Sequence, residues 1–374
     1  MEQKLTKIKI LIFLTIPFLT FLLIMEWGVR AFVEFEPNRV LCYDPVMGRS
    51  YCPETKGYLT ENKVKMHIEV NADGLLGKAY PVNRFSGKYR IALLGDSFTS
   101  GEAVNPESKF AGVWEKNLSN KIPTGVEVIN FGVGGTGTWQ QLQMWHIKAR
   151  KYKPDLTILA FCWCNDIENN IDKFQSGGMS PLLDEYEVKW YKRLQAKRKN
   201  FNKWLWNNSG LYQFTRTRYN HLEHYFKRIF LPDYMKTVSY YEKKQSRPLY
   251  TKDTASIFDD LLFFDSEGWD VTRKLIVKLK QEVGKNGGEL AVIHFGGLSQ
   301  YRNFPALPLK NFDAFLESEG ISYFNNFDLF LKIDDKFLNK NFIPNDGHFN
   351  EIGHRHFAEF SMDFLFNLIN KSKA

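Results

Sequence analysis

Residues 89–97 read YRIALLGDS, and this stretch decides the fold. Residues 89–94 form a compact apolar run, and Gly95-Asp96-Ser97 end it with small and polar side chains. An apolar run of this length that stops at a turn signal is typical of a buried β-strand. Helical spacing of apolar residues follows from about 109 to 118. The stretch therefore predicts a strand, a tight turn and a helix, with Ser97 at the carboxyl end of the strand.

The same alternation of strands and helices continues along the chain. Short apolar strands separated by helices predict a mostly parallel α/β sheet that is covered by helices on both faces. One stretch, from about 167 to 269, breaks this rhythm and reads as a large insertion rich in aromatic and basic residues. The expected strands are 89–94, 126–131, 156–161 and 289–295, and the expected helices are about 109–118, 138–151, 271–283 and 351–368.

Four clusters of glycine and polar residues lie at loop positions of this predicted fold. Because ligand sites of open α/β sheets form at the carboxyl ends of the strands, we expect the fold to bring these loops together. Together they contain a serine, a glycine-rich turn, an asparagine and an aspartate–histidine pair. The clusters are GDSF at 95–98, NFGVGGTG at 130–137, ND at 165–166 and NDGHFN at 345–350.

Acyl transfer is the chemistry that needs these groups. A serine hydroxyl is a weak nucleophile and needs a neighbouring base, for which histidine is suited near neutral pH. A carboxylate beside the histidine fixes its tautomer and stabilises the imidazolium. The oxyanion needs fixed donors. The N–H of Ser97, a close approach of backbone at Gly135 and the side-chain amide of Asn165 can supply them.

On these residues the chain resembles the SGNH, or GDSL-type, hydrolase superfamily, over about residues 89–368 without the insertion. Four motifs in the correct order carry the resemblance, since G-D-S alone recurs by chance. The resemblance implies a flavodoxin-like three-layer α/β fold. It also implies a catalytic triad of Ser97 as the nucleophile, His348 as the base and Asp346 as its support, and an oxyanion hole formed by Ser97, Gly135 and Asn165.

Two positions depart from the usual motifs of this superfamily. The common last motif is D-x-x-H, whereas Asp346 stands two residues before His348. Membrane-associated relatives that O-acetylate bacterial exopolysaccharides are similar in carrying D-x-H. Trp163 replaces the glycine of the third motif, G-x-N-D, and either packs against a sugar ring or fills the core. Asp166 caps or braces its loop, and Asp96, Trp163 and Asp166 are our weaker candidates for contact with substrate.

An apolar segment near the N-terminus predicts a membrane anchor. Residues 10–25 read ILIFLTIPFLTFLLIM without a charge, and inclusion of 27–29 brings the run to the thickness of a bilayer core. Three lysines precede the run and acids are prominent after it, so the N-terminus should stay in the cytoplasm while the rest is extracytoplasmic. No small-x-small cleavage site follows, which favours a signal anchor over a cleaved signal peptide. We therefore divide the chain into a stub and transmembrane anchor (1–30), an extracytoplasmic segment (31–88) and the α/β domain (89–370).

The four cysteines are too few for a disulfide scaffold. In an exported protein, Cys42 and Cys52 could form a disulfide that closes a small loop. Cys162 and Cys164 lie two residues apart on an expected strand, so their side chains share one face and a bond between them would need distortion. We therefore expect Cys162 and Cys164 to be two buried thiols.

The charge is concentrated in the insertion. The 374 residues are 44% hydrophobic, which excludes a disordered protein, and carry a formal net charge of +8. Residues 187–252 contain 16 Lys and Arg against four Asp and Glu, so the rest of the chain is mildly acidic. Fifteen of these residues are aromatic. Export argues against a nucleic-acid partner, and leaves anionic glycans, anionic lipid or simple solvation of basic helices. We expect this segment to cover the active site and bind a glycan.

The sequence thus predicts an envelope-anchored serine esterase or O-acyltransferase that acts on acylated polysaccharide through an acyl-enzyme. The alternatives are a lipid esterase, and a catalytically inactive protein that binds or assembles glycans. No cofactor or metal is expected. Residues 132–137 fit the dinucleotide fingerprint G-x-G-x-x-G, but Asp155 begins a strand, whereas the ribose-binding acid ends one. His354 and His356 lie on different faces of a helix and cannot easily join His348 at one metal.

Overall fold

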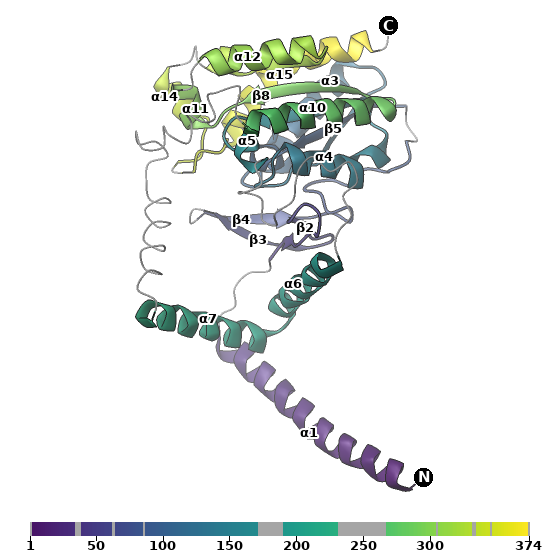
Figure 1. Ribbon diagram of the computed structural model, residues 1–374, viewed down its shortest axis with the longest axis vertical. Helices are drawn as coiled ribbons and strands as arrows, with labels where there is room; N and C mark the ends of the chain where they lie inside the picture. Colours follow the sequence, from purple (N-terminus) through teal and green to yellow (C-terminus); the bar gives the residue numbers. More distant parts are fainter. Residues whose placement is uncertain are drawn as a thin grey trace. The chain divides into compact units, whose positions relative to one another are not determined.

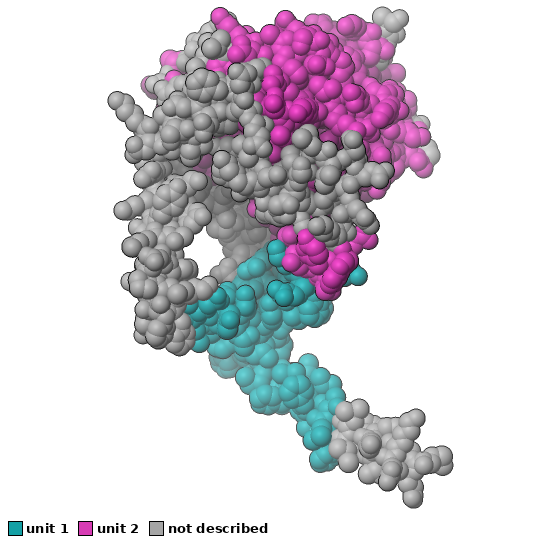
Figure 2. All heavy atoms as spheres, viewed as in Figure 1, with its two compact units in different colours: residues 1–39, 197–248 teal, residues 40–196, 249–374 magenta. Residues whose placement is uncertain are grey.

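The computed structural model divides the chain into two compact units, each described here by itself (Figure 2). One unit contains residues 1–39 and 197–248, and the other contains residues 40–196 and 249–374. The structure describes residues 2–33, 39–61, 64–84, 87–170, 190–230, 267–303, 306–330, 334–344 and 346–372.

A parallel sheet of five strands forms the centre of the larger unit (Figure 1). Its strand order is β6-β5-β7-β8-β9, which is the 2-1-3-4-5 order of flavodoxin-like folds. All four predicted strands are confirmed, and the predicted three-layer α/β class is correct. Every residue of β5 and β7 is buried, which explains their nearly continuous apolar runs. The strands are β5 (Tyr89–Gly95), β6 (Val126–Asn130), β7 (Leu156–Cys162), β8 (Glu289–Phe295) and β9 (Ser322–Asn325).

Helices pack in pairs against this sheet, with β8 visible between the pairs in Figure 1. α3 (Phe110–Lys121) packs against α15 (Glu351–Lys371), and α4 (Thr138–Ile147) packs against α10 (Glu267–Lys285). Buried Trp114 on α3 fixes the first pair, because its indole N–H donates to the Ala358 carbonyl at 3.3 Å. α12 (Ala306–Ser318) precedes β9.

Short helices follow the strands at their carboxyl ends, where the site is expected. α2 (Ser97–Ser100) follows β5, α5 (Asp166–Asn169) follows β7, and α11 (Leu298–Asn303) follows β8. The chain leaves β5 toward β6 on one side and later returns to β7 on the other. This reversal is the point at which ligands bind in open α/β sheets. The remaining short elements are the 3₁₀ helices Pro106–Ser108 and Ala149–Tyr152, α13 (Phe327–Phe330) and α14 (Asp335–Asn339).

The segment before the sheet packs within the same unit as two small antiparallel pairs. β1 (Leu41–Cys42) pairs with β2 (Ser50–Tyr51), and β3 (Lys56–Glu61) pairs with β4 (Val64–Glu69). A disulfide joins Cys42 to Cys52 and closes the loop between β1 and β2. The disulfide that the sequence allowed at this position is therefore present.

The smaller unit is helical. It contains α1 (Glu2–Phe32), the part of α6 (Trp190–Asn208) from residue 197 onward, and α7 (Gly210–Phe230). Residues 13–32 of α1 have a mean hydropathy of 1.5 and none of this window is buried. α1 is therefore long and apolar enough to cross a membrane or to be a signal sequence. The rest of the predicted insertion, including Tyr240 and Tyr241, lies outside the described residues.

A buried ion pair joins the two strands at the amino end of the sheet. Arg90 on β5 is fully buried, and its guanidinium donates to Glu127 on β6 at 2.7 and 2.9 Å. The remaining donors of Arg90 reach the carbonyls of Pro81, Val82 and Tyr152 at 2.7–3.1 Å. Arg90 thereby ties the entry to β5 and the turn before β7 to the strand that lies beside it.

Replacement of one partner of this pair should destabilise the fold strongly. We expect Arg90→Met to lower the free energy of unfolding by roughly 3–5 kcal/mol, because Glu127 would be left buried without its partner. The double variant Arg90→Met/Glu127→Met should recover most of this loss. Urea unfolding followed by tryptophan fluorescence measures both values. Equal losses in the single and double variants would contradict the argument.

Candidate active site

Ser97 begins α2, directly after the central strand β5. Asp96 caps this short helix, because its Oδ1 accepts the N–H of Phe98 at 2.9 Å. Ser97 remains partly exposed, while Asp96, Phe98 and Ser100 are buried. The first N–H groups of a helix have no acceptor within that helix. The local fold therefore presents the Ser97 hydroxyl and its backbone N–H at the same point.

His348 and Asp346 complete a triad with Ser97. The Oγ atom of Ser97 lies 2.7 Å from Nε2 of His348, and Nδ1 of His348 is hydrogen-bonded to Oδ1 of Asp346. The same Oδ1 accepts the backbone N–H of His348 at 3.1 Å. A carboxylate at Nδ1 fixes the tautomer that carries its proton there, and Nε2 is then free to accept the serine proton.

Asp346 and His348 can form a hydrogen bond across the D-x-H spacing because the residue between them is a glycine. Gly347 has a φ of +90°, a conformation that side-chain-bearing residues rarely adopt. The chain therefore turns sharply enough for Asp346 and His348 to face each other across one residue. The prediction that placed Asp346 as the partner of His348 is consistent with this geometry.

A small hollow lies beside the triad and is mostly apolar. The ring of Phe98 packs on that of His348 with centroids 4.7 Å apart, and Phe349 packs edge-on against Phe98. The contact with Phe98 holds the imidazole ring in place, and Phe349 supports Phe98. The hollow is lined by Ser97, Phe98, Gly101, Glu102, Ala103, Ile343, Asp346, His348, Phe349 and His354.

The glycine-rich turn after β6 lies against the nucleophile turn. A Cβ atom on Gly132 would come within 2.6 Å of the backbone nitrogen of Ser100, and one on Gly134 within 3.6 Å of the Ser97 side chain. Gly135 has a φ of +69°. This turn thus brings Gly135, one of the predicted oxyanion donors, to the neighbourhood of Ser97. The predicted oxyanion hole of Ser97, Gly135 and Asn165 remains a prediction.

Cys162 and Cys164 are bonded to each other, so the expectation of two buried thiols was wrong. β7 ends at Cys162 and the chain then turns, which brings the two Cα atoms to 5.2 Å. Two alternate residues on an extended strand lie farther apart than this and point in one direction. The turn removes the geometric objection, and the disulfide closes the loop immediately before Asn165. Sγ of Cys164 lies 3.4 Å from Oδ1 of Asn165.

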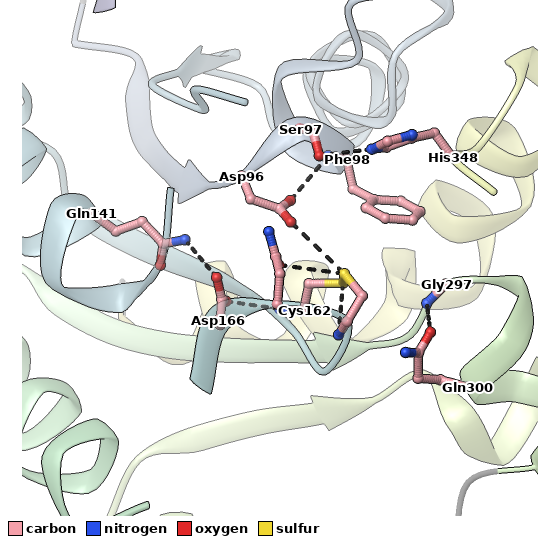
Figure 3. The surroundings of a disulfide bond; sticks show 11 residues. Asp96, Ser97, Phe98, Gln141, Cys162, Asp166, Gly297, Gln300 and His348 are labelled. Atoms are coloured by element: carbon pink, nitrogen blue, oxygen red, sulfur yellow. Dashed lines mark hydrogen bonds between the residues drawn. A yellow bond between two sulfur atoms is a disulfide. The ribbon is translucent and has the colours of Figure 1, made fainter. Parts of the chain in front are cut away.

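Two buried carboxyl groups support these turns (Figure 3). Figure 3 shows Asp96 between Ser97 and the disulfide, and Asp166 beside Gln141. Burial raises the pKa of Asp96 to about 6, against a lowering effect of His348. Burial and the charge of Asp96 raise the pKa of Asp166 well above its ordinary value. Asp166 accepts the N–H of Cys162 at 2.9 Å and the Gln141 amide at 3.1 Å, so it braces its loop.

Trp163 is held inside the fold by a chain of hydrogen bonds. Its indole N–H donates to Nδ1 of His294 at 3.2 Å, and Nε2 of His294 lies 2.7 Å from Asp313. The Trp163 ring also packs against Trp269 and Phe312. Trp163 therefore fills the core. Asp96, Trp163 and Asp166 are all buried and bonded to neighbouring protein groups, and their contact with substrate remains a prediction.

Residues of β2 and of the loop before it contact the turns around the triad, and the sequence did not predict these contacts. Arg49 donates to the Gly134 carbonyl at 3.2 Å, and Tyr51 donates a hydrogen bond to Glu102 at the edge of the hollow. Burial and Glu102 raise the pKa of Tyr51, so its phenol stays protonated. Both residues belong to the loop that the Cys42–Cys52 disulfide closes. The cysteine spacing was the signal that this loop is ordered, but nothing in the sequence placed it beside the glycine-rich turn.

One group of potential metal ligands occurs among the described residues. Donor atoms of Asp96, Cys162 and Cys164 lie within 4.8 Å of one another. Cysteine binds metals as a thiolate, and here both sulfurs are engaged in the disulfide. Asp155, the acid considered for a dinucleotide ribose, instead pairs with Arg84 at 2.8 Å and accepts the N–H of Arg90 at the start of the sheet.

His354 lies behind the nucleophile turn and should make stability depend on pH. Burial, Lys109 and His348 lower its pKa from 6.5 to about 3. Its Nδ1 accepts the N–H of Phe110 at 3.3 Å, which requires the neutral ring. The unfolded chain therefore takes up a proton at His354 near pH 6.5, while the folded protein does not. Stability from this group is complete above pH 6.5 and is lost as the pH falls toward 3.

The comparison of wild type with His354→Asn isolates this effect. We expect the stability advantage of the wild type to shrink by about 1.4 kcal/mol per pH unit below 6.5, or roughly 2 kcal/mol between pH 6.5 and 5. The asparagine oxygen can still accept the Phe110 N–H. Other acids, including Asp96, titrate in both proteins and cancel. Urea unfolding at several pH values gives the difference, and parallel curves would show that His354 titrates normally.

No family model matches the sequence, and no curated protein matches it. The structure is similar to a lipase/acylhydrolase from Enterococcus faecalis, with a TM-score of 0.40 and 12% identity, over 75% of this chain and 96% of the other. It is also similar to an acetyl xylan esterase (TM-score 0.40, 12% identity, 73% and 98% coverage). A two-domain esterase active on acetylated mannans gives a TM-score of 0.39 and 14% identity, with 76% and 50% coverage. Likenesses of this strength do not identify a function, which has to be inferred from the site itself.

Proposed function

We propose that the protein is a serine esterase or O-acyltransferase of the SGNH type, anchored in the cell envelope by α1 and active on acylated glycans. One observation carries the catalytic part of this proposal. Ser97 Oγ is within hydrogen-bond reach of His348 Nε2 at 2.7 Å, while the other ring nitrogen is bonded to Asp346. A nucleophile, a base and an orienting carboxylate in this order form the constellation of a serine acyl-transfer enzyme.

The proposed reaction proceeds through an acyl-enzyme. His348 takes the proton of Ser97 as its oxygen attacks the ester carbonyl, and Asp346 stabilises the imidazolium that forms. The N–H groups of Ser97 and Gly135 and the amide of Asn165 would hold the oxyanion. The tetrahedral intermediate collapses as His348 returns the proton to the leaving alcohol. A water or a sugar hydroxyl, deprotonated by His348, then attacks the acyl group, and His348 returns this proton to the Ser97 oxygen as the bond between the acyl group and Ser97 breaks.

The surroundings of Ser97 support a small acyl group. The hollow beside the triad is lined by Phe98, Ala103, Ile343 and Phe349, with Gly101 at its wall. Such a lining suits an acetyl-sized group, while the sugar part of the substrate would lie outside it. Polysaccharide O-acetyl groups combine these two features. A location in the envelope, as proposed for α1, would give the enzyme access to exported glycans.

Capture of the acyl-enzyme tests the proposal. The detergent-solubilised full-length protein would be mixed with 4-nitrophenyl acetate, quenched in acid within seconds and digested. We expect a mass increase of one acetyl group on the peptide that contains Ser97. Addition of acetyl-free polysaccharides then separates the two fates, because transfer would place the acetyl group on the glycan and hydrolysis would release acetate. A folded protein that neither forms the adduct nor releases nitrophenol would show that the triad is inactive.

A further inference from the structure

A carboxylate near the end of α1 joins the apolar helix to the helical insertion. Glu26 accepts hydrogen bonds from the Ser209 hydroxyl at 2.8 Å and from the backbone N–H groups of Gly210 and Leu211 at 2.7 and 2.9 Å. These donors lie at the start of the long helix α7, where N–H groups have no acceptor within the helix. Glu26 therefore caps α7, and Figure 1 shows α7 lying across the end of α1.

Further bonds fix the corner between α6 and α7 at the same level. Arg30 of α1 bonds to Glu26 at 2.6 Å and donates to the carbonyl of Asn208, the last residue of α6, at 2.7 Å. The side chain of Asn207 pairs with the backbone of Arg39 at 3.0 and 3.2 Å. The corner is thus attached to the α1 end by charged and backbone groups rather than by apolar packing alone.

This level is where a membrane-spanning α1 would leave the bilayer. The apolar window ends at Phe32, and its last turns contain Glu26, Trp27 and Arg30. Tryptophan and charged residues mark the boundary between hydrocarbon and headgroups. If α1 is the anchor proposed above, the corner between α6 and α7 is held at the membrane surface. The end of α6 and the start of α7 then lie within reach of lipid headgroups.

α6 exposes an apolar stripe that has no partner among the described residues. At 100° per residue, Trp190, Leu194, Phe201 and Trp204 fall on one side of the helix, and their exposed fractions are 75%, 59%, 57% and 56%. Phe201 and Trp204 stack with ring centroids 6.0 Å apart. Exposed aromatic and aliphatic side chains in such a row are unusual on a surface that faces only water.

Basic side chains lie within and beside this stripe and continue onto α7. At 100° per residue, Lys197 falls within the stripe, and Arg193 and Arg198 fall at its two edges; all three are exposed, and residues 197–208 contain no acidic residue. On α7, Arg216 and Arg218 are exposed near Tyr219, whose exposed fraction is 55%. Apolar residues with lysine and arginine at their edges are typical of helices that lie in the interface of an anionic membrane.

We propose that α6 and α7 bind the anionic lipid surface of the membrane that α1 spans, and so hold the insertion flat against it. The exposed rings would enter the headgroup layer while the basic side chains contact lipid phosphates. A glycan would account for the charge and for some of the rings. It would not account for an exposed Leu194 and Phe201 on a helix whose end is attached to the boundary of an apolar span. The structure therefore favours lipid over the glycan that the sequence led us to expect for this segment.

Hydrogen exchange of the full-length protein in lipid nanodiscs tests this proposal without any measurement of activity. We expect amides of residues 197–208 and 213–222 to exchange about tenfold more slowly in phosphatidylcholine with 30% phosphatidylglycerol than in phosphatidylcholine alone. The variant Arg193→Glu/Lys197→Glu/Arg198→Glu should lose this difference, because these three basic side chains lie within or beside the stripe. The matched variant Lys116→Glu/Lys336→Glu/Lys371→Glu changes the same charge at exposed sites of the larger unit and should keep it.

Three outcomes would overturn the proposal. Exchange that is the same in both lipid mixtures would exclude recognition of anionic lipid. Protection that appears only after addition of an acidic polysaccharide would assign the surface to a glycan. Retention of the lipid effect in Phe201→Ser/Trp204→Ser would show that the apolar stripe does not enter the membrane. Because catalytic residues are untouched, failure here would leave the proposed acyl-transfer activity standing, and an inactive enzyme would leave the lipid result unaffected.

Discussion

Ser97→Ala should abolish ester hydrolysis, with kcat falling by roughly 10⁴–10⁶-fold while the fold is retained. The hydroxyl of Ser97 is the only part removed, and it is the atom that lies 2.7 Å from the base His348. Without it no acyl-enzyme forms, so labelling by a fluorophosphonate probe should disappear together with turnover. Hydrolysis of 4-nitrophenyl acetate by the detergent-solubilised protein gives the rate, and gel fluorescence gives the labelling.

Ser100→Ala is the matched control for this variant. Ser100 lies on the same short helix, is buried, and donates its hydroxyl to the Ser97 carbonyl at 3.1 Å. The Ser100→Ala variant loses a hydrogen bond near the nucleophile but no reacting atom, so most of the esterase activity should remain. If Ser97→Ala kept more than about a tenth of the wild-type rate, the esterase activity would come from another residue, and the proposed mechanism would fail.

The fold was predictable because burial on both faces leaves a simple pattern in the sequence. β5 and β7 are buried along their whole length and read as unbroken apolar runs. The strand β9 was not predicted, because Ser322–Asn325 is half-buried, polar at both ends and only four residues long. Its place at the edge of the sheet is set by packing against β8, which no local pattern encodes.

The position of the candidate site could be anticipated for a related reason. Ser97 stands at the carboxyl end of β5, where ligand sites of parallel sheets form, whereas Asp346 and His348 come from the loop between α14 and α15. Sequence spacing could not show how Asp346 and His348 face each other, because that depends on the backbone angle at Gly347. The wrong expectation for Cys162 and Cys164 also came from a backbone turn that the sequence does not show. We placed both cysteines on one extended strand, whereas Asp166 binds the N–H of Cys162 and the chain turns there.

The sequence did not show which residues contact one another behind the candidate site. Trp163 directly follows β7, His294 lies on β8 and Asp313 lies on α12, and only the folded sheet brings them into one hydrogen-bond chain. Arg49 reaches the glycine-rich turn from the loop between β1 and β2. Such contacts join positions far apart in the chain, and one sequence cannot pair them.

The carboxylate is the part of the triad whose loss discriminates best between a catalytic and a merely structural site. Asp346→Asn should lower kcat by about 10⁴-fold with little change in KM. An asparagine amide would donate to Nδ1 of His348, so the ring proton would move to Nε2, where it would face the Ser97 hydroxyl. His348 could then no longer accept the serine proton. Fluorophosphonate labelling should slow in parallel with turnover, because both need the same base.

Asp313→Asn provides the matched control, since the chain contains a second aspartate–histidine pair. Asp313 lies 2.7 Å from Nε2 of buried His294 and makes the same kind of contact as Asp346 does with His348. The other nitrogen of His294 accepts from Trp163 rather than from a nucleophile. The same chemical change there should affect stability and leave kcat within a few-fold of wild type. Equal losses of kcat in the two variants would mean that the Asp346 effect is structural. A large loss confined to Asp346→Asn would place this carboxylate in the reaction, despite the D-x-H spacing.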